Sequence, residues 1–282
     1  MANPLACEEL PEFSATKYRI STMTITGGIN TDVNLQALYN SLSENTPENV
    51  SYIEFGKNKH ELQSSGTHSK HQKKKKKIED KPKNRFDNQL TIVITTQSRH
   101  NVKLFNNGNV QMTGVKSEEE GKKTIDYLIE IITERCETTP DIVSDIKKIE
   151  NINYRIRLIN SDFKVNYEIR LDHLYKLVTL QHKIVCSYEP CIYPGAKIEY
   201  YFPTNGFCEC TKFCNGKSDT CKKITIVVFQ SGCIIITGAN KIEHIEVAYA
   251  FICDILKNNR SKVRRNKLKL PIKTIKTPLL KT

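Results

Sequence analysis

The sequence predicts an α+β protein built from a duplicated unit of roughly 110 to 130 residues, and three observations support this prediction. Segments 102–116 (VKLFNNGNVQMTGVK) and 223–240 (KITIVVFQSGCIIITGAN) share one layout, in which two apolar runs flank a glycine-containing turn and Thr-Gly ends the second run. Tyr18-Arg19-Ile20 recurs further along the chain as Tyr154-Arg155-Ile156. Each unit reads as strand, helix, irregular segment, strands and helix. We therefore expect two sheets fused edge to edge with pseudo-twofold symmetry.

The first unit opens with an alternating strand over 17–26 that ends at Gly27-Gly28. A helix is expected over 30–42, and the further strands lie at 50–56, 90–96 and 102–105, the last of which opens a hairpin. Ser117 and Glu120 have the spacing of a capping box, which predicts that the next helix begins there and ends near Arg135.

The second unit follows a short linker helix expected over 141–148. Its helix is predicted at 170–180 and its strands within 187–202. The apolar runs 224–229 and 233–236 on either side of Ser231-Gly232 predict a tight hairpin. Asn240, with Glu243 three residues later, is expected to cap the last helix.

Charge is concentrated in two segments. The formal net charge is +12, but residues 57–85 hold 11 Lys and Arg against 3 acidic residues, and residues 257–282 hold 10 and no acidic residue. The remaining chain is mildly acidic, at −6, so nucleic acid is the expected partner of these basic arms. The five-lysine run is either a solvated flexible segment or a nuclear-targeting or nonspecific DNA-binding arm.

These observations give the expected organisation. No run of about 18 apolar residues or basic leader segment is present, so neither a membrane span nor secretion is expected, and the ten cysteines fit a reducing, intracellular compartment. The expected segments are a disordered tail (1–16), a first repeat (17–136) with a disordered lysine-rich insertion (57–85), a linker (137–149), a second repeat (150–256) with a cysteine-rich insertion (203–222), and a basic tail (257–282).

The cysteine-rich insertion has the spacing C-x-C-x3-C-x6-C. Four thiolates this close together in the chain suit one tetrahedral structural zinc ion, although the spacing is not a standard CxxC pair, and free thiols are the alternative. The expected ligands are Cys208, Cys210, Cys214 and Cys221. No other cofactor is expected.

Two motifs give a family resemblance. Ser187–Gly195 (SYEPCIYPG), followed by a Phe-x-Ser-Gly turn and Thr-Gly-Ala, closely resembles the second repeat of the TATA-box-binding protein family. Leu104-Phe105-x-x-Gly and the run MTGVKSE at 112–118 match the first repeat of that family. The similarity covers most of residues 17–56, 86–135 and 150–256, and the long insertions resemble a version encoded by a large DNA virus.

The resemblance implies a saddle, a curved antiparallel sheet with helices on its convex face and DNA under its concave face. Proteins of this kind insert apolar side chains between base steps of the minor groove and kink the duplex by ~80°. The matching wedge positions are Phe105 and Phe229, with Tyr193 where the second repeat's other Phe is expected. In the first repeat the second wedge is Phe86, with Phe55 as the alternative.

The resemblance also implies the lining of the groove and a partner surface. The expected groove contacts are Ile20, Thr22, Thr113, Lys116, Val227, Ile235 and Thr237. Asn153, or Asn151, would replace the family's central asparagine after a register shift. Lys103 and Gln111 depart from the family's apolar residues, which puts preference for a TATA sequence in doubt. Glu189 and Ile192 match positions that contact a TFIIB-like factor.

The function implied is that of a general transcription initiation factor, which binds and kinks promoter DNA and nucleates assembly of the RNA polymerase preinitiation complex. It would act in a host nucleus or a cytoplasmic viral factory. The alternative is an interaction adaptor of the transcription machinery that keeps the fold and has lost TATA-specific bending. Related half-saddles occur in nucleases and glycosylases, but no paired carboxylates or nucleophile–base pair accompany the duplication, so an enzyme is not expected.

Overall fold

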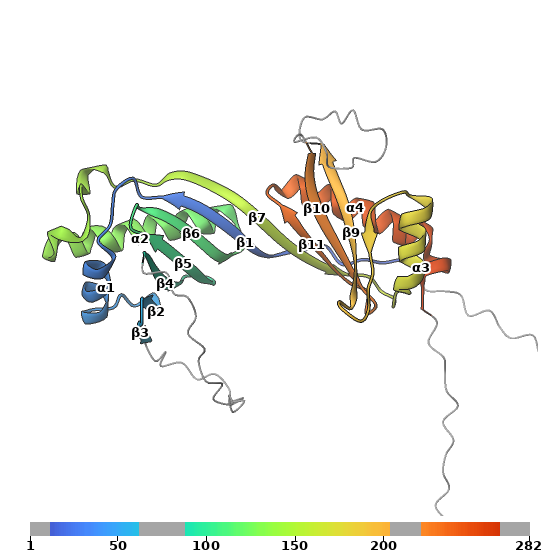
Figure 1. Cartoon of the computed structure of the whole chain (residues 1–282), viewed down its shortest axis with the longest axis horizontal. Coiled ribbons are helices and arrows are strands. Elements are labelled where there is room, and N and C mark those ends of the chain that lie inside the picture. Colours follow the sequence, from blue (N-terminus) through green and yellow to red (C-terminus); the bar gives the residue numbers. More distant parts are fainter. Residues whose placement is uncertain (1–11, 62–87, 204–220, 266–282) are drawn as a thin grey trace, which may run out of the picture.

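The computed structural model describes residues 12–61, 88–203 and 221–265. Within them the strands form one eleven-stranded sheet in the order β3-β2-β4-β5-β6-β1-β7-β11-β10-β9-β8. Figure 1 shows its two halves joined by β1 and β7. The strands of the first half are β1 (Arg19–Gly28), β2 (Val50–Phe55), β3 (Asn58–Glu61), β4 (Gln89–Thr95), β5 (Arg99–Phe105) and β6 (Asn109–Val115). Those of the second half are β7 (Ile152–Lys164), β8 (Cys186–Ser187), β9 (Gly195–Pro203), β10 (Cys221–Phe229) and β11 (Cys233–Ala239).

Within the same ranges, five helices and several short turns accompany the strands. The helices are α1 (Leu35–Glu44), α2 (Glu118–Thr138), α3 (Leu171–Lys176), α4 (Ile242–Asn258) and α5 (Arg260–Val263). A π-helical turn, Leu177–Gln181, continues α3. The linker forms two 3₁₀ turns, Pro140–Ile142 and Ile146–Lys148, in place of the single helix that the sequence predicted.

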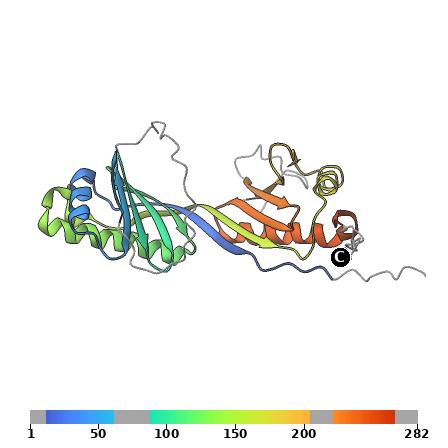
Figure 2. The same cartoon turned by 90° about the horizontal axis from the view of Figure 1, so that it is seen from below.

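The sheet confirms the predicted duplication. Outward from the central pair β1 and β7, the order β6-β5-β4-β2 on one side mirrors β11-β10-β9-β8 on the other. β1 and β7 are paired antiparallel from Arg19 opposite Asp162 to Gly28 opposite Ile152, and they pass from one half into the other (Figure 2). The two halves are therefore joined through hydrogen-bonded strands, as expected for sheets fused edge to edge.

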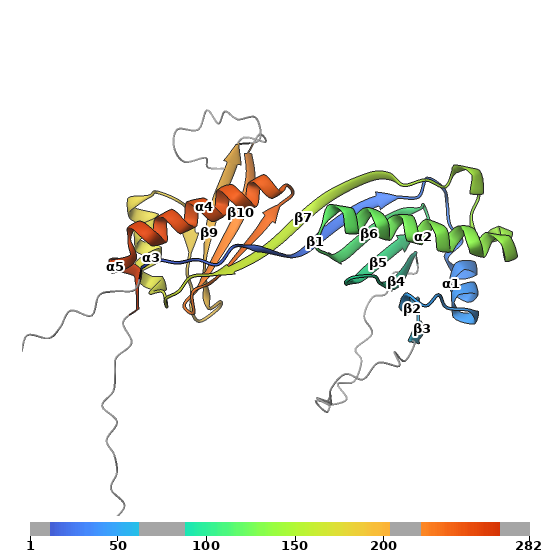
Figure 3. The ribbon, with the colours of Figure 1, turned by 180° about the vertical axis from the view of Figure 1, so that it is seen from behind.

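The hydrophobic core lies on one face of this sheet. Along β11 the buried residues Ile234 and Ile236 alternate with Ile235, which is half-buried. α2 and α4 bury apolar stripes against this face, and Figure 3 shows both helices in front of the strands. We call this side the helix-covered face. The opposite side is the open face.

Helix capping follows the prediction in one half only. The Ser117 Oγ accepts from the Glu120 backbone N–H at 3.2 Å, which begins α2 as the capping box predicted. The predicted Asn240 cap of α4 is wrong, because α4 has Lys241 as its N-cap with no side-chain hydrogen bond. The Asn240 Oδ1 is instead buried without a hydrogen-bond partner.

Three segments expected to lie outside the folded repeats are partly ordered. Residues 58–61 form β3, which pairs with β2, although they belong to the predicted insertion 57–85. Residues 257–265 of the predicted basic tail complete α4 and form α5, where Val263 is fully buried. In the predicted tail 1–16, Ala15 forms a bridge to Val165. The remaining parts, 1–11, 62–87, 204–220 and 266–282, lie outside the described residues.

The N-terminal segment reaches across to the second half. The Thr16 backbone N–H donates to the Lys164 carbonyl at 2.9 Å, and the Tyr249 hydroxyl of α4 donates to the Thr16 carbonyl at 3.0 Å. The Tyr18 hydroxyl donates to Glu246 at 3.2 Å. The chain before β1 is therefore held by the last long helix.

Candidate nucleic-acid interface

The alternation of side chains along the hairpin strands decides which residues lie on the open face. On β5, Lys103 and Phe105 alternate with buried core residues, and on β10, Val227 and Phe229 do the same. Directly opposite residues in an antiparallel pair lie on the same face, so the partners of these residues are also on the open face. The second hairpin strands add Gln111, Thr113, Ile235 and Thr237.

An aromatic cluster occupies the end of the second-half hairpin. The rings of Tyr193 and Phe229 have centroids 6.0 Å apart at 55°, and the Lys197 Nζ lies 4.3 Å from the Tyr193 centroid. Gly195 is directly opposite Phe229. A Cβ at Gly195 would lie 2.8 Å from Val227 Cγ1 and about as close to both rings, at 3.0 and 3.1 Å. We call Tyr193, Gly195, Val227 and Phe229 the wedge cluster.

A groove runs beside the wedge cluster. It has a volume of about 590 Å³ and mostly apolar walls, and Phe229 and Ile235 line it together with Cys233. Arg19 and Asp162 form one of its edges, with the Arg19 Nε 2.8 Å from the Asp162 Oδ2. The groove therefore offers apolar surface next to Phe229, with Lys17 and Lys164 also among its lining residues.

A row of polar side chains crosses the centre of the open face. Thr22 on β1 lies opposite Asn160 on β7, and the Thr237 hydroxyl of β11 donates to the Asn160 Oδ1. The sequence predicted Thr22 and Thr237 and missed Asn160. The repeat could have revealed Asn160. The offset that relates Tyr18 to Tyr154 also relates Thr24 to Asn160, so Asn160 occupies in the second repeat the position of a residue in the middle of β1.

Comparison with known proteins agrees with this arrangement. Residues 153–259 match the family model of transcription factor TFIID, or TATA-binding protein. A curated relative, the TATA-box-binding protein-like protein of Acanthamoeba polyphaga mimivirus, is 34% identical over 200 residues, which are 67% of this chain and 53% of the relative. The chain belongs to the TATA-box-binding protein family.

Two further comparisons involve proteins of cellular organisms. The TATA-box-binding protein of Tetrahymena thermophila is 28% identical over 159 residues, 56% of this chain and 51% of that protein. The chain spans about half the length of these curated relatives. Among solved structures, Methanococcus jannaschii TBP is 18% identical with a TM-score of 0.49, covering 86% of this chain and 99% of that one. The mimivirus protein confirms the expected likeness to a viral member of the family.

The first-half wedge positions are only partly described. Phe105 is half-buried on the open face, directly opposite Gln89. Phe86 lies outside the described residues. The alternative, Phe55, is wrong, because its ring packs against Tyr39 of α1 on the helix-covered face, with centroids 6.3 Å apart.

Two of the predicted groove contacts lie elsewhere than expected. Ile20 is opposite the fully buried Ser161 and packs against the hydrophobic core. The pairing of β1 and β7 shifts register between Ile20 and Thr22, and this bulge at Ser21 places Ile20 on the helix-covered face. Asn153 is exposed in a left-handed conformation (φ 55°) at the start of β7, away from the central row.

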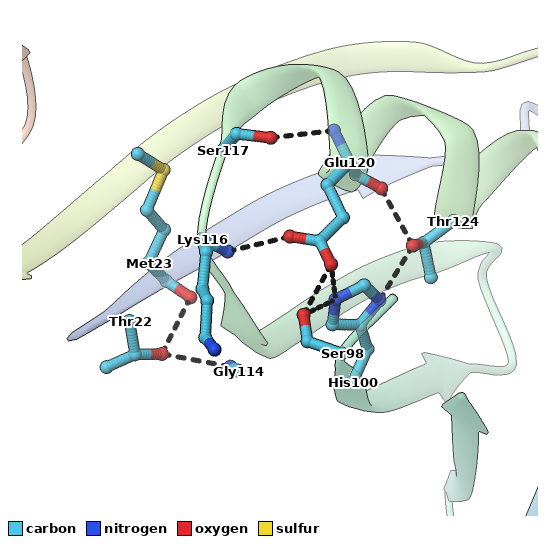
Figure 4. Close-up of polar contacts among 9 residues, drawn as sticks. All are labelled: Thr22, Met23, Ser98, His100, Gly114, Lys116, Ser117, Glu120 and Thr124. Carbon is cyan, nitrogen blue, oxygen red and sulfur yellow. Dashed lines mark hydrogen bonds and ion pairs between the residues drawn. The ribbon is translucent and has the colours of Figure 1, made fainter. Parts of the chain in front are cut away.

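Lys116 lies at the end of β6, exposed, beside the start of α2 (Figure 4). Its backbone N–H donates to the Glu120 Oε2 at 3.1 Å, so the capping carboxylate holds the turn in which Lys116 sits. The Thr22 hydroxyl accepts from the Gly114 N–H at 3.0 Å, which ties the central row to the same turn. Lys116 is thus placed at the rim of the open face, and Thr113 is exposed on it.

A buried polar network supports this turn from behind. His100 is fully buried, with its Nδ1 2.8 Å from the Thr124 Oγ1 and its Nε2 3.1 Å from the Glu120 Oε1. Ser98 hydrogen-bonds to Glu120 and to the His100 Nε2 (Figure 4). Burial raises the pKa of Glu120, but the hydrogen bonds from Ser98 and the Lys116 N–H, together with His100, hold the pKa below its ordinary value.

The predicted partner surface is a tight turn before β9. The Glu189 carbonyl accepts from the backbone N–H groups of Ile192 and Tyr193, both at 2.9 Å. This turn sends Tyr193 to the wedge cluster and leaves Ile192 80% exposed. The same turn therefore presents an apolar side chain outward and an aromatic one to the open face.

The expected zinc site lies almost entirely outside the described residues. Cys208, Cys210 and Cys214 are in the segment 204–220, and Cys221 is the half-buried first residue of β10. In the ranges that the structure describes, no cluster of His, Cys, Asp and Glu has the arrangement of a metal site. No helix in those ranges is long and apolar enough to cross a membrane.

Proposed function

We propose that this chain is a TATA-box-binding-protein-like transcription initiation factor that binds promoter DNA through the minor groove and kinks it. The observation that supports this most directly is the wedge cluster, two aromatic rings at the end of a hairpin beside an apolar groove on the open face. Family membership supports a role in transcription by binding rather than by catalysis.

The geometry suits intercalation. Unstacking a base step costs a few kcal/mol, and only a flat apolar group can replace the lost stacking without leaving polar groups unpaired. Phe229 and Tyr193 offer two such rings side by side, and Gly195 leaves the space in which they pack. The buried Val227 next to them would support the two rings from the sheet. Phe105 would act in the same way at the other half.

We further propose that the turn containing Glu189 and Ile192 binds a TFIIB-like factor, through which the RNA polymerase machinery is recruited. Ile192 is a large apolar side chain left 80% exposed, and Glu189 adds a charge beside it, which together fit a small protein contact. Ile192→Ala should weaken binding of such a factor to the DNA complex and leave DNA bending unchanged. The site of action would be a host nucleus or a viral factory.

A bending assay tests the proposed function. A short A·T-rich duplex labelled at both ends with a fluorescence donor and acceptor should show increased transfer when the protein binds, and a G·C-rich duplex should show less. Phe229→Ala should reduce the bend. Tyr175→Ala, which removes an exposed aromatic side chain on α3, is the matched control and should bend DNA as the parent does. Binding without any bend in the parent would contradict the proposal.

The polar open face of the first half favours a second candidate function, an adaptor that keeps the fold without bending DNA. Lys103 lies opposite Gln111 where the family's floor is apolar. If the chain is an adaptor, the parent protein should bind a TFIIB-like factor and should not bend any of the DNA duplexes. The same assay therefore separates the two functions.

We also propose that the cysteine-rich insertion binds one zinc ion through Cys208, Cys210, Cys214 and Cys221. Four thiolates are the donor set of structural zinc sites. Elemental analysis of protein purified under reducing conditions should find about one zinc ion per chain. Cys208→Ser with Cys214→Ser should remove it, and equal metal content in parent and variant would contradict the site.

A further inference from the structure

The start of α2 in the first half is closed by acceptors from its own chain. The Ser117 Oγ caps the helix, and the Glu120 carboxylate folds back over the same turn (Figure 4). This carboxylate accepts from the Lys116 backbone N–H at 3.1 Å, and it lies 3.1 Å from the His100 Nε2. Ser98 hydrogen-bonds to it as well. A negative charge therefore occupies the N-terminus of α2, where the helix dipole and the unpaired N–H groups favour an anion.

The duplication places different chemistry at the start of α4. The offset that relates Phe105 to Phe229 also relates each residue at the start of α2 to one at the start of α4. The equivalents of Ser98, Ser117 and Glu120 are, in that order, Lys222, Lys241 and His244. Both serines are thus replaced by lysine, and the carboxylate is replaced by an imidazole. The N-cap Lys241 makes no side-chain capping hydrogen bond, so α4 begins without the acceptors that α2 has.

The charge at the two helix starts differs accordingly. The first turn of α2 holds three acidic residues, Glu118, Glu119 and Glu120. The first turn of α4 holds one, Glu243, with Lys222 and Lys241 at the positions of the two serines. With histidine neutral, the net charge over these equivalent positions is −3 in the first half and +1 in the second. The second half therefore attracts an anion where the first half supplies its own.

Two polar side chains at the start of α4 are buried without a hydrogen-bond partner among the described residues. They are His244, which is 3% exposed and unpaired at its Nδ1, and Asn240, which is unpaired at its Oδ1. His244 is the third residue of α4, the position from which Glu120 reaches back to the turn before α2. Buried polar groups are nearly always hydrogen-bonded in folded proteins, so this pair points to a ligand at the helix N-terminus.

The two lysines act on the same place. Burial lowers the pKa of His244 first, and the positive charges of Lys241 and Lys222 lower it further, against Glu243. A neutral imidazole donates one ring N–H, and in one of its two tautomers that donor is Nδ1. The Asn240 amide can turn its NH2 group to the side of its oxygen, because the two ends have nearly the same shape. The start of α4 therefore offers ring, amide and backbone N–H groups to an anion.

We propose that the start of α4 binds the phosphate group of a phosphorylated segment of a partner protein. A phosphate monoester carries a charge of about −1.5 to −2 at pH 7 and three strong acceptor oxygens, which suit two lysines and several N–H donors better than a single carboxylate does. Ile242, which is 39% exposed beside Lys241, gives an apolar contact for the residues that flank the phosphate.

This site is separate from the surface proposed to meet DNA. The His244 ring packs against Phe202 of β9, with centroids 4.6 Å apart, and Phe202 in turn packs against the hydrophobic core. The core lies on the helix-covered face, so a ligand at His244 is held on that side of the sheet. A protein segment fits there, whereas a duplex seated on the open face lies on the other side.

Nuclear magnetic resonance of the full chain tests the site. Inorganic phosphate, compared with chloride at equal ionic strength, should shift the amide signals of residues 241–244 and the ring signals of His244. It should also raise the pKa of His244, because a bound anion favours the imidazolium. An acetylated phosphoserine–leucine dipeptide should bind on the order of fivefold more tightly than inorganic phosphate, because its leucine covers Ile242. The unphosphorylated dipeptide should not bind.

A capping variant tests the residues. Lys241→Ser with His244→Glu gives α4 the capping box of α2 and so fills the site from within. Its affinity for the phosphorylated dipeptide should fall on the order of tenfold or more, because it replaces a charged donor with a competing carboxylate. Lys222→Gln leaves the helix itself unchanged and should weaken binding on the order of fivefold. Lys257→Gln, in the last turn of α4, is the charge control and should bind as the parent does.

Four results would overturn the inference. Phosphate and chloride could give the same shifts, or the capping variant and Lys222→Gln could both keep the parental affinity. Binding of inorganic phosphate without binding of the phosphorylated dipeptide would assign the site to a small anion instead of a protein segment. Displacement of the dipeptide by a DNA duplex would assign it to the DNA-binding surface. The proposed function does not depend on any of these results.

Discussion

The two halves of this protein share a core and differ on the face proposed to meet DNA. On the helix-covered face, Val102 and Leu104 of β5 correspond to Ile226 and Val228 of β10, and all four are fully buried. On the open face the equivalent pairs are Lys103 opposite Gln111 and Val227 opposite Ile235. Packing constrains the core positions of both copies in the same way. The open-face positions are not constrained by packing, and their residues differ between the copies.

The largest expected effect comes from removing an aromatic residue that both halves keep, the one at the end of the hairpin. Phe105→Ala with Phe229→Ala should abolish most of the DNA bend and weaken binding to A·T-rich DNA by about 1–3 kcal/mol per ring. The double variant should bind A·T-rich and G·C-rich duplexes alike. Energy transfer across end-labelled duplexes measures the bend, and circular dichroism checks the fold.

If both single variants reduced the bend equally, the halves would be equivalent as wedges. We expect Phe229→Ala to have the larger effect, because its ring packs beside Tyr193 over an apolar groove. A double variant that bends DNA as the parent does would show that the wedge residues are assigned wrongly.

A second contrast lies opposite each wedge, where Gly195 stands in one half and Gln89 in the other. Gly195→Ala places a methyl group 2.8 Å from Val227 and should destabilise the protein by about 1–3 kcal/mol while displacing the rings. Gln89→Ala is the matched variant, and its free energy of unfolding should stay within about 0.5 kcal/mol of the parent. Denaturant titration of both variants checks this. Equal stabilities would contradict the packing of the wedge cluster.

The open-face pair in the middle of each hairpin can be exchanged between the halves. Lys103→Val with Gln111→Ile gives the first half the pair found in the second. The slope of log affinity against log salt should then become shallower by about 0.9 for each phosphate that is no longer neutralised. Val227→Lys with Ile235→Gln should steepen it. Binding measured from low to high salt gives both slopes. Parallel slopes for all three proteins would mean that Lys103 does not contact phosphate.

The last contrast concerns acid stability, in which the halves also differ. Glu120 caps α2 with its pKa below the ordinary 4.5, so its stabilising contribution is present above pH 4.5 and is lost as pH falls further. Its equivalent is His244, whose pKa is lowered from 6.5 by burial and by Lys241 and Lys222, against Glu243. Protonation of His244 is less favourable in the folded protein than in the unfolded chain. His244 therefore lowers the free energy of unfolding increasingly as pH falls below 6.5.

Glu120→Gln should therefore cost about 1–3 kcal/mol at pH 7 and flatten the loss of stability below pH 4.5. His244→Phe should flatten the loss between pH 6.5 and 4.5 instead. Unfolding free energies across this range give both curves. A Glu120→Gln variant with the parental curve at low pH would rule out this network as a source of acid sensitivity.

Much of the fold was predictable because the duplication is written in short, local patterns. The Thr-Gly hairpin ends and the Ser117 capping box predicted β5, β6, β10, β11 and the start of α2. The bulge at Ser21 was not predictable, because a bulge depends on how β1 pairs with a strand of the other repeat, which is distant in the sequence. Because of this one extra residue, Ile20 lies on the helix-covered face instead of the open face.

The family motif led to the candidate residues of the second half. Phe229, Tyr193, Val227 and Thr237 lie on or beside the open face, and their contact with DNA stays a prediction. Asn160 could be found only through the repeat offset, and no local pattern singled out the packing role of Gly195. Asn240 shows the opposite error, since a good capping residue proved not to be the cap. The offset that relates Phe105 to Phe229 also relates Ser117 to Lys241, so the N-cap has the same repeat position in both halves and Asn240 lies one residue before it.

The contacts of the N-terminal segment with α4 determine when the protein can finish folding. The hydrogen bond from Tyr249 to Thr16 joins residues 233 positions apart, and Tyr18 is tied to Glu246 over 228. Contacts of such high sequence separation raise the contact order and slow folding, because the closure of a long loop comes before any gain from the contact. On the ribosome the segment before β1 cannot make these contacts until α4 has been synthesised. The contacts therefore form only after both copies have been made, although each copy carries its own hairpins and core.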